Sequence, residues 1–372
     1  MEERNKILNK FNIAECAIVF LSVFFKYLII HEISRKILYV YLIVLIIFTI
    51  VIIYKKKFKK KEFIRIFAMF GLSVYFVCFY ADVNFFISLL LAIVCIRKEN
   101  KDFVKVFFIT STILYCTNII LNFVGIVPSN NMIRNVSSGT IIRYDLGFGH
   151  PNAVFLFLLP IIFSGYYLFN TKKTFYIISI VGSLVLFNLS NCRTGICCAM
   201  LMIGLGWLQS FKGKFRKNNL LRFAFIVYTI ISIFIACKFG GEIKNVANEI
   251  LSKRPYFWNL YIENDDMFTL FGHNLCSNWY VDNFYLYLLI ELGIVGFVIY
   301  GLLYYFSIKK IKSDYKLALI LLIFLTYGMF ETNVIIGSIQ FVFAIQLKNL
   351  IQDKDVRLNK DGQSSEYSDT DI

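Results

Sequence analysis

The chain has 372 residues, of which 58% are apolar and only 17% are charged, and its mean hydropathy is +0.66. A soluble domain of this length carries far more charge on its surface, so the composition indicates a polytopic membrane protein. The formal net charge of +15 comes mainly from short Lys and Arg blocks between apolar runs. Such blocks follow the positive-inside rule of membrane proteins and argue against a nucleic-acid partner.

The apolar runs are about 15 to 25 residues long, which is the length of helices that cross a bilayer. Alternating strands of the outer-membrane barrel kind are absent from the sequence. The sequence therefore predicts an all-α integral membrane protein whose single helical domain covers residues 1–350, with about 12 spans. The spans are expected at residues 12–30, 37–54, 63–80, 82–96, 103–127, 152–169, 174–190, 194–210, 220–239, 283–307, 315–330 and 333–350.

Most Lys and Arg residues of the loops fall on the N-terminal side of these spans, which predicts that both termini are cytoplasmic. The first span carries Glu15 and Lys26 and lacks a small-residue cleavage site, so we expect an uncleaved helix. The long outward loop is then 240–282, in which residues 254–261 are expected to fold back on the bundle as a short amphipathic helix. The polar segment 351–372 is expected to be a disordered cytoplasmic tail.

Arg193 lies in a short outward connection between two apolar spans. A guanidinium held there needs protein, a water-filled cavity or an anion around it, and its planar fork suits phosphate oxygens. The alternative is an arginine that extends to lipid headgroups, and position alone does not decide between the two interpretations.

His150 and Asn152 stand at the start of the span 152–169, with Pro151 near the first helical position. The free N–H groups and the partial positive charge of a helix N-terminus favour a nearby anion. The alternative interpretation is a helix-capping turn whose histidine is satisfied within the protein.

The long outward loop and the next span supply a third group of candidates. An imidazole titrates near neutral pH and can act as an acid or a base. Aromatic rings there could stack on sugars, although Trp and Tyr are also expected at any membrane interface. Asp265 and Asp266 could bind a divalent cation, but adjacent acids in a solvated loop usually bind none, so no metal site is predicted. The candidates are Arg254, Trp258, Tyr261, His273, Asn274 and Asn283.

These motifs resemble those of the O-antigen ligase and polysaccharide polymerase superfamily, which are bacterial membrane glycosyltransferases. Residues 149–152 resemble the Gly-His-Pro-Asn start of a middle span, and residues 190–195 resemble the Ser…Arg-Thr-Gly motif. Arg254 with Trp258 is similar to the Arg-x-x-x-Trp element of the large loop. Residues 271–273, 282–286 and 291–296 resemble the loop exit and the helix after it. The resemblance covers about residues 140–300.

The resemblance implies transfer of a glycan from an undecaprenyl-pyrophosphate carrier to an acceptor sugar on the outer face of the bacterial plasma membrane. No nucleotide sugar, metal or other cofactor is implied. The implied partners are the lipid-linked oligosaccharide, membrane lipid, a chain-length regulator and a flippase. Many family members have His where this chain has Asp282, so no catalytic role is assigned to Asp282 at this point.

The leading hypothesis is a polymerase of capsular or exopolysaccharide (O-antigen-like) repeat units. Arg193 and Arg254 are expected to neutralise the leaving pyrophosphate, and His273, ahead of His150, is expected to be the base. The alternatives are an O-antigen-type ligase, which uses the same chemistry on another acceptor, and a transporter or flippase of lipid-linked oligosaccharides. The residues predicted to bind substrate are His150, Asn152, Trp258, Tyr261, Asn274 and Asn283.

Overall fold

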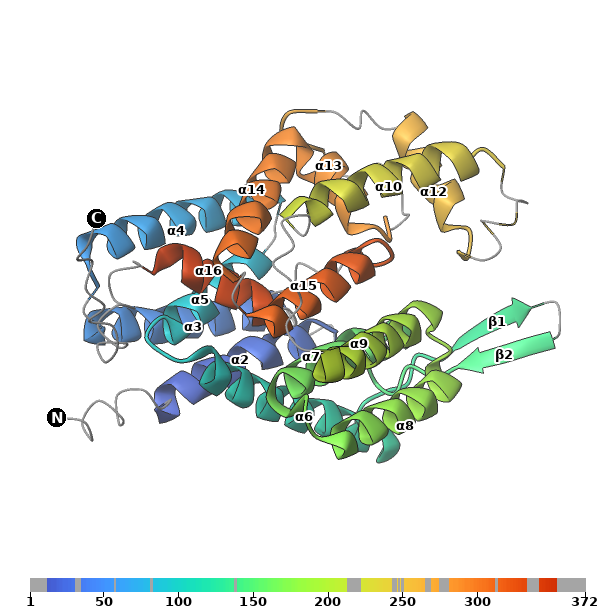
Figure 1. Cartoon of the computed structure of the whole chain (residues 1–372), viewed down its shortest axis with the longest axis horizontal. Coiled ribbons are helices and arrows are strands. Elements are labelled where there is room, and N and C mark those ends of the chain that lie inside the picture. The colour runs from blue at the N-terminus through green and yellow to red at the C-terminus, as the bar shows by residue number, and fades with distance from the viewer. Residues whose placement is uncertain are drawn as a thin grey trace, which may run out of the picture.

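The computed structural model describes residues 12–30, 35–56, 58–80, 83–136, 139–212, 222–242, 246, 248, 251–264, 269–273, 281–311, 314–332 and 341–352. Within these residues the chain is mostly helical, with fourteen helices and one two-stranded hairpin (Figure 1). The hairpin pairs β1 (Met132–Val136) with β2 (Gly139–Arg143) in antiparallel register. The helices are α2 (Ile13–Ile30), α3 (Arg35–Lys55), α4 (Lys60–Tyr80), α5 (Asn84–Cys95), α6 (Asn100–Phe123), α7 (Pro151–Phe169), α8 (Lys173–Ser190), α9 (Arg193–Lys212), α10 (Ala224–Phe239), α12 (Arg254–Asn264), α13 (Phe284–Glu291), α14 (Gly293–Ile311), α15 (Tyr315–Gly328) and α16 (Phe341–Ile351).

The centre of the bundle is built around two short helices, α5 and α16. Nearly every residue of both is buried. The two helices pack against each other and against α4, and α16 also packs against α6 and α14. A helix that is apolar all round lies either in a protein core or in a membrane, and the burial of α5 and α16 places them in the core. At about 18 Å, α5 is also too short to cross a bilayer, which fits its position inside the bundle.

The apolar helices agree with a membrane protein. By length and composition, α6, α7 and α8 are able to cross a membrane, and several further described helices of 10–17 residues are apolar. The large exposed apolar side chains of α8, such as Ile177, Ile178 and Val185, form the kind of surface that faces lipid. The expected number of spans and the side of the membrane on which the termini lie stay predictions.

Two details of the sequence prediction are wrong. The expected span 283–307 is interrupted, because α13 ends at Glu291 and α14 begins at Gly293, whose φ of +64° does not continue a helix. The expected loop 128–151 contains the β1–β2 hairpin, which adds a small sheet to the all-α expectation. The predicted helix in residues 254–261 is confirmed as α12, which packs on α10. Residues 333–340 of the last expected span and residues 353–372 of the expected tail lie outside the described residues.

The bundle has two ends, which differ in what they hold. The start of α7, the end of α8 and the start of α9 lie at the same end as the hairpin and α12 (Figure 1). The starts of α4 and α6 and the end of α16 lie at the opposite end, where Lys348 Nζ donates a hydrogen bond of 2.9 Å to Asn100 Oδ1. With 24 residues, α6 spans about 36 Å between the two ends.

Candidate functional site: a cation-lined cavity

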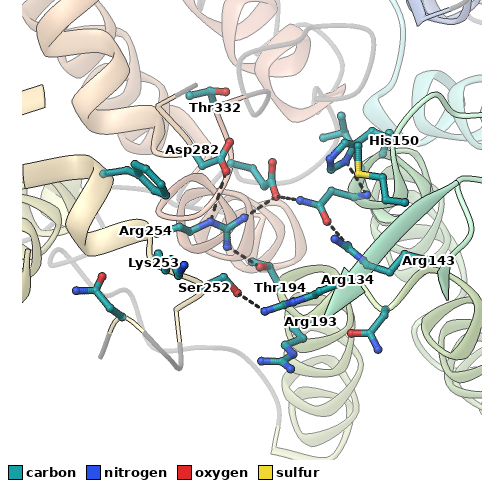
Figure 2. A pocket seen from close by; sticks show the side chains of 18 of the residues that line it. Arg134, Arg143, His150, Arg193, Thr194, Ser252, Lys253, Arg254, Asp282 and Thr332 are labelled. Carbon is teal, nitrogen blue, oxygen red and sulfur yellow. Dashed lines mark hydrogen bonds and ion pairs between the residues drawn. The ribbon is translucent and has the colours of Figure 1, made fainter. Parts of the chain in front are cut away.

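Two arginines reach the site from the hairpin. Met132 pairs with Arg143, and Arg134 pairs with Ile141. Side chains two residues apart in a strand share a face, so Arg134 and Arg143 lie on the same face of the hairpin. That face is turned toward the helix ends, where both guanidinium groups line a cavity (Figure 2).

The turn before α7 is held from inside the bundle. Phe148 is buried, and its ring stacks on Tyr115 with centroids 4.9 Å apart. Gly147 and Gly149 flank it with φ of +79° and +74°, which glycine adopts without strain. A Cβ on Gly147 would lie 2.9 Å from Asn122 Cβ, so a larger residue would not fit. The turn therefore fixes the position at which α7 begins.

His150 is the N-cap of α7. Its Nδ1 accepts a hydrogen bond of 3.0 Å from the backbone N–H of Asn152, with Pro151 between them in the first helical position. This is the capping turn that the sequence left as an alternative. The same His150 side chain also lines the cavity, so the cap does not rule out a place in the site, and that role stays a prediction.

The connection from α8 to α9 presents Arg193. Asn191 ends α8 in the left-handed conformation with φ of +49°, and Arg193 is the first residue of α9. A Cβ on Gly195 would lie 2.2 Å from Phe155 Cβ, so only glycine lets the start of α9 lie this close to α7. The Arg-Thr-Gly motif thus brings Arg193 and Thr194 to the start of α7.

Arg254 begins α12, and the backbone before it is unusual. Ser252 and Lys253 have φ of +59° and +64°, a conformation that residues other than glycine rarely adopt. Asn248 supports this turn, because its Oδ1 accepts the Tyr256 N–H at 2.8 Å and its backbone oxygen accepts the Lys253 N–H at 2.6 Å. The turn brings Ser252, Lys253 and Arg254 together at the cavity.

These segments surround one cavity of about 770 Å³ (Figure 2). Its volume falls in the range of sites that bind a substantial ligand. Five cationic side chains line it, against two carboxylates. The charged and titratable lining residues are Arg134, Arg143, His150, Arg193, Lys253, Arg254, Asp282 and Glu331.

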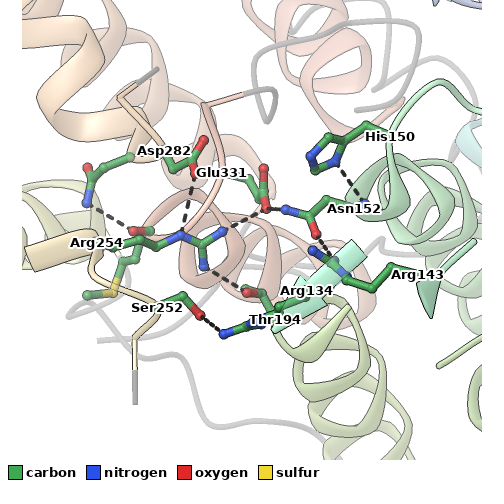
Figure 3. A network of polar contacts seen from close by, with 11 residues as sticks. Arg134, Arg143, His150, Asn152, Thr194, Ser252, Arg254, Asp282 and Glu331 are labelled. Carbon is green, nitrogen blue, oxygen red and sulfur yellow. Dashed lines mark hydrogen bonds and ion pairs between the residues drawn. The ribbon is translucent and has the colours of Figure 1, made fainter. Parts of the chain in front are cut away.

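Arg254 is held by three partners (Figure 3). Its Nη1 donates to Thr194 Oγ1 at 2.9 Å, and its Nη2 lies 3.2 Å from Glu331 Oε1. Its Nε lies 3.7 Å from Asp282 Oδ2. The guanidinium therefore joins α12, α9 and the segments that follow α15 and precede α13.

The network continues through α7 to the hairpin (Figure 3). Asn152 Nδ2 donates to Glu331 Oε1 at 3.2 Å, and Asn152 Oδ1 accepts from Arg143 Nη2 at 2.7 Å. Arg143 Nε in turn donates to the backbone oxygen of Ser190 at 3.0 Å. Contacts that link so many elements give the cavity wall a defined shape.

The remaining cations are not neutralised in this way. Among the described residues, no carboxylate lies within ion-pair distance of Arg134, Arg193 or Lys253. Burial lowers the pKa of Arg134, and the positive charges of Arg193 and Arg254 lower it further. The cavity thus has a wall of like charges that repel one another, and an anion would relieve that repulsion.

The titratable groups of the site are also perturbed. Burial raises the pKa of Glu331 to about 7, against the opposing effect of Arg254. Partial desolvation by the cavity walls also raises the pKa of Asp282, although 43% of its side chain stays exposed. Burial lowers the pKa of His150, and the nearby Arg143 charge adds to that effect. Perturbed groups that converge in one cavity mark it as the candidate functional site.

The structure brings together four of the residues that the sequence singled out: His150, Asn152, Arg193 and Arg254 all line the cavity. Four other described candidates, Trp258, Tyr261, His273 and Asn283, do not line it. Trp258 and Tyr261 are buried in a separate apolar cluster with Leu286 and Ile290. Their place in that cluster fixes α12 to the bundle and does not offer rings to a sugar.

Asn283 is a joint between helices. It is fully buried, caps α13 through Oδ1, and donates from Nδ2 to Ser232 Oγ and to the Met329 backbone oxygen, both at 3.0 Å. It therefore holds α13 against α10 and the end of α15. These contacts place Asp282, which precedes Asn283, and Glu331, which lies two residues after Met329, at the cavity.

His273 lies away from the cavity. Its backbone N–H donates to the Ile290 oxygen at 3.1 Å, near the far end of α13 from Asp282. The eight residues of α13 separate those two points by about 12 Å. The sequence's first choice of base is therefore not placed at the site. Asn274, Asp265 and Asp266 lie outside the described residues.

The segment before His273 has a structural role. A Cβ on Gly272 would lie 2.0 Å from the Glu291 oxygen, and one on Gly293 would lie 2.2 Å from Gly272 N. The oxygens of Thr269 and Leu270 accept the first N–H groups of α14 at 3.0 and 3.1 Å. Residues 269–273 thus fill the break between α13 and α14, and the oxygens of Thr269 and Leu270 satisfy N–H groups that a helix start leaves free.

Sequence reasoning missed Arg134, Arg143 and Glu331 and assigned no role to Asp282. The signal for Arg134 was its place in a long outward loop that already held the Gly-Phe-Gly turn. Glu331 carried a signal as an acid at the end of an apolar span, where an ionisable residue needs a partner. No family model, no curated protein and no solved structure matches this chain. Among the described residues, no group of three His, Cys, Asp or Glu side chains is placed to hold a metal ion.

Proposed function

We propose that this protein is a membrane glycosyltransferase that uses a glycan carried on undecaprenyl pyrophosphate. In the form we favour, it is a polymerase of capsular or exopolysaccharide repeat units. The observation that carries the proposal is the cavity wall of Arg134, Arg193 and Lys253, which has no carboxylate partner in the described part of the chain. Such a wall suits a multiply charged anion, and a pyrophosphate diester is one.

The cations of this wall should stabilise the transition state of the transfer more than they stabilise the bound donor. When the bond between the sugar and pyrophosphate breaks, the pyrophosphate gains negative charge. Fixed cations that face the developing charge lower the barrier, and one such donor is typically worth about 10²- to 10³-fold in rate. Arg193 is the best placed, since it makes no hydrogen bond or ion pair with the described residues and its fork is free for oxygens.

Arg254 has a different part from the one that we expected of it. Three of its N–H groups already face Thr194, Asp282 and Glu331. We assign to it the positioning of the two carboxylates beside the anion wall, and only its remaining donors to the pyrophosphate. The leaving-group role therefore passes mainly to Arg193 and Arg134.

A carrier of lipid-linked oligosaccharides is the alternative of a different class. Transporters usually bind their cargo near the middle of the membrane, between repeated halves. Here the cationic cavity lies at the ends of α7, α8 and α9, which is where a lipid pyrophosphate at the membrane surface would enter. A ligase would share the site, and only the acceptor that it uses would differ.

The test is transfer by the purified protein in lipid nanodiscs. Lipid-linked repeat units are supplied, and products are separated as a glycan ladder. We expect a ladder of several repeats from the wild-type protein, and its loss by about 10²-fold or more in Arg193→Ala. Arg222→Ala is the matched control, because this arginine precedes α10 and does not line the cavity.

Three outcomes distinguish the hypotheses. A ladder supports the polymerase. A single transfer to a different acceptor, with no ladder, indicates the ligase. Movement of labelled lipid across a vesicle membrane with no new glycosidic bond would establish the carrier and refute the transferase.

A further inference from the structure

Transfer to a hydroxyl group needs a proton acceptor beside the anion wall. Three titratable side chains of the described residues line the cavity and could take a proton near neutral pH: His150, Asp282 and Glu331. Their contacts differ, and the contacts decide which of the three is available.

His150 already serves as the N-cap of α7. Its Nδ1 accepts the Asn152 N–H, so in the neutral ring the proton lies on Nε2. That nitrogen is then a hydrogen-bond donor. To take a proton on Nε2, the ring would have to move its own proton to Nδ1 and break the cap of α7. His150 is therefore suited to donate to a sugar or phosphate oxygen and not to act as the base.

Glu331 already accepts hydrogen bonds from two residues of the network. Its Oε1 accepts from both Arg254 Nη2 and Asn152 Nδ2 at 3.2 Å, and only 8% of its side chain is exposed. An acceptor sugar would have to displace part of the cavity wall to reach it. Glu331 is thus better placed to hold Arg254 than to meet a substrate.

Asp282 is the accessible carboxylate. Its side chain is 43% exposed and faces the cavity, and its contact with Arg254 Nε, at 3.7 Å, uses one oxygen. The buried Asn283 next to it donates hydrogen bonds to Ser232 Oγ and to the Met329 oxygen, and these contacts fix the backbone beside Asp282. The charged groups around Asp282 are Arg254 from α12 and Glu331 after α15.

We infer that Asp282 is the catalytic base, with Arg254 and Glu331 as the residues that position it. The inference rests on the proposed function and adds to it the residue that receives the proton. It replaces His273 and His150, which the sequence favoured. The raised pKa of Asp282 agrees with this role, because a carboxylate with a higher pKa is a stronger base.

The step balances as a single displacement. The oxygen of the acceptor hydroxyl forms a bond to the anomeric carbon of the donor sugar. The bond between that carbon and the pyrophosphate oxygen breaks, and its electron pair leaves with the pyrophosphate. The hydroxyl proton passes to Asp282, and the new charge on the pyrophosphate faces Arg193 and Arg134.

The test separates binding from transfer. Binding of undecaprenyl pyrophosphate to the protein in nanodiscs is measured by native mass spectrometry, and transfer is measured from the glycan ladder. In Asp282→Asn the amide oxygen can still accept from Arg254, so we expect carrier binding within about threefold of the wild-type protein and transfer lower by about 10²- to 10⁴-fold.

The dependence of the rate on pH gives a second measurement. The wild-type rate should rise with pH as Asp282 loses its proton, and Asp282→Glu should keep part of the rate with that rise shifted. The residual rate of Asp282→Asn should lack the rise. If Asp282→Asn does not fold, as judged by its thermal unfolding midpoint, the dependence of the Asp282→Glu rate on pH takes its place as the test. A rate that rises at the same pH as in the wild-type protein then overturns the inference.

Two results would overturn the assignment while leaving the proposed function intact. One is transfer by Asp282→Asn above about one-tenth of the wild-type rate, which is incompatible with a base that contributes 10²-fold or more. The other is loss of carrier binding together with transfer in that folded variant. Failure of the wild-type protein to bind the carrier or form glycosidic bonds would instead refute the proposed function.

Discussion

The two ends of the helical bundle differ in how their charged side chains are paired. At the end opposite the cavity, each buried acid is matched within the protein: Glu15 lies 3.1 Å from Lys56 and 2.9 Å from Lys98. Glu62 Oε1 accepts a hydrogen bond of 2.9 Å from Arg97 Nη1, and Glu62 Oε2 accepts a second one from Arg97 Nη2. At this end Lys56, Lys98 and Arg97 are thus the ion-pair partners of buried acids.

At the cavity end the balance is reversed. Two carboxylates face five cations, and the two acids share one guanidinium, that of Arg254. Arg134 and Arg193 are close enough for each charge to affect the other. Since like charges near each other destabilise a fold, such an arrangement is retained only where something else offsets it. The comparison supports the proposal that one end stabilises the structure and that the other end is an anion site.

The largest expected effect on stability is at the end opposite the cavity. Arg97→Ala would leave the buried Glu62 carboxylate without its main cation, which typically costs about 3 kcal/mol or more. We expect a lower thermal unfolding midpoint in detergent, with the transfer rate per folded molecule unchanged. Arg193→Ala should lower the transfer rate and leave the unfolding midpoint unchanged, because the Arg193 side chain makes no hydrogen bond or ion pair with the described residues. Equal losses of stability in both variants would contradict the contrast between the ends.

Gly195→Ala should affect both properties. The added Cβ would overlap Phe155, and overpacking of this kind costs about 1–3 kcal/mol. Because Arg193 and Thr194 begin the same helix, their position at the cavity should shift, and transfer should fall along with the unfolding midpoint. Gly204→Ala is the matched control, since a Cβ there would meet no atom within 4 Å. If Gly195→Ala behaves like Gly204→Ala, the close packing of α9 on α7 is not what positions Arg193.

Glu331→Gln should change how stability depends on pH. Burial raises the pKa of Glu331 to about 7 in the folded protein, so the folded state binds more protons than the unfolded state between the two pKa values. Stability from this group is therefore present at low pH and is lost as the pH rises toward 7. The loss should be on the order of 3 kcal/mol, because the pKa rises from 4.5 to about 7 and each pKa unit is worth about 1.4 kcal/mol.

The measurement is the unfolding midpoint at several pH values from about 5 to about 8. Relative to the wild-type protein, Glu331→Gln should become more favourable as the pH rises, because glutamine never carries the buried charge. A constant difference between the two proteins would mean that Glu331 keeps its ordinary pKa.

His273→Ala should have the smallest effect. Alanine keeps the hydrogen bond from the residue 273 backbone N–H to the Ile290 oxygen, and the His273 side chain does not line the cavity. We expect transfer within about twofold of the wild-type rate, where a lost catalytic base would cost about 10²-fold or more. A loss of that size, with an unchanged unfolding midpoint, would restore His273 as the base.

Much of the helical frame could be predicted from the sequence, because long apolar runs and short basic loops have few structural solutions. The gathering of His150, Arg193 and Arg254 followed from their places at helix ends on one predicted side. The break at Gly293 could not be predicted in this way, since it depends on residues 269–272 entering between α13 and α14. Periodicity within one segment does not reveal a contact from another.

The chemistry of the site was harder to predict for a related reason. Glu331 is made special by burial against Arg254 and Asn152, which come from distant segments. His273 was the natural choice by side-chain type alone, but its side chain does not line the cavity. The β1–β2 hairpin brings Arg134 and Arg143 to the cavity, and short strands within an outward loop leave little pattern in the sequence.

The most direct test of the account is binding of undecaprenyl pyrophosphate to the wild-type protein, Arg193→Ala and Arg222→Ala in the same nanodiscs. A hydrogen bond to a charged group is worth about 1.5–3 kcal/mol, so Arg193→Ala should bind at least about tenfold more weakly. Arg222→Ala should bind as the wild-type protein does. Equal affinity of all three proteins for the carrier would show that the cations of the cavity do not hold its pyrophosphate, and the proposed anion site would be wrong.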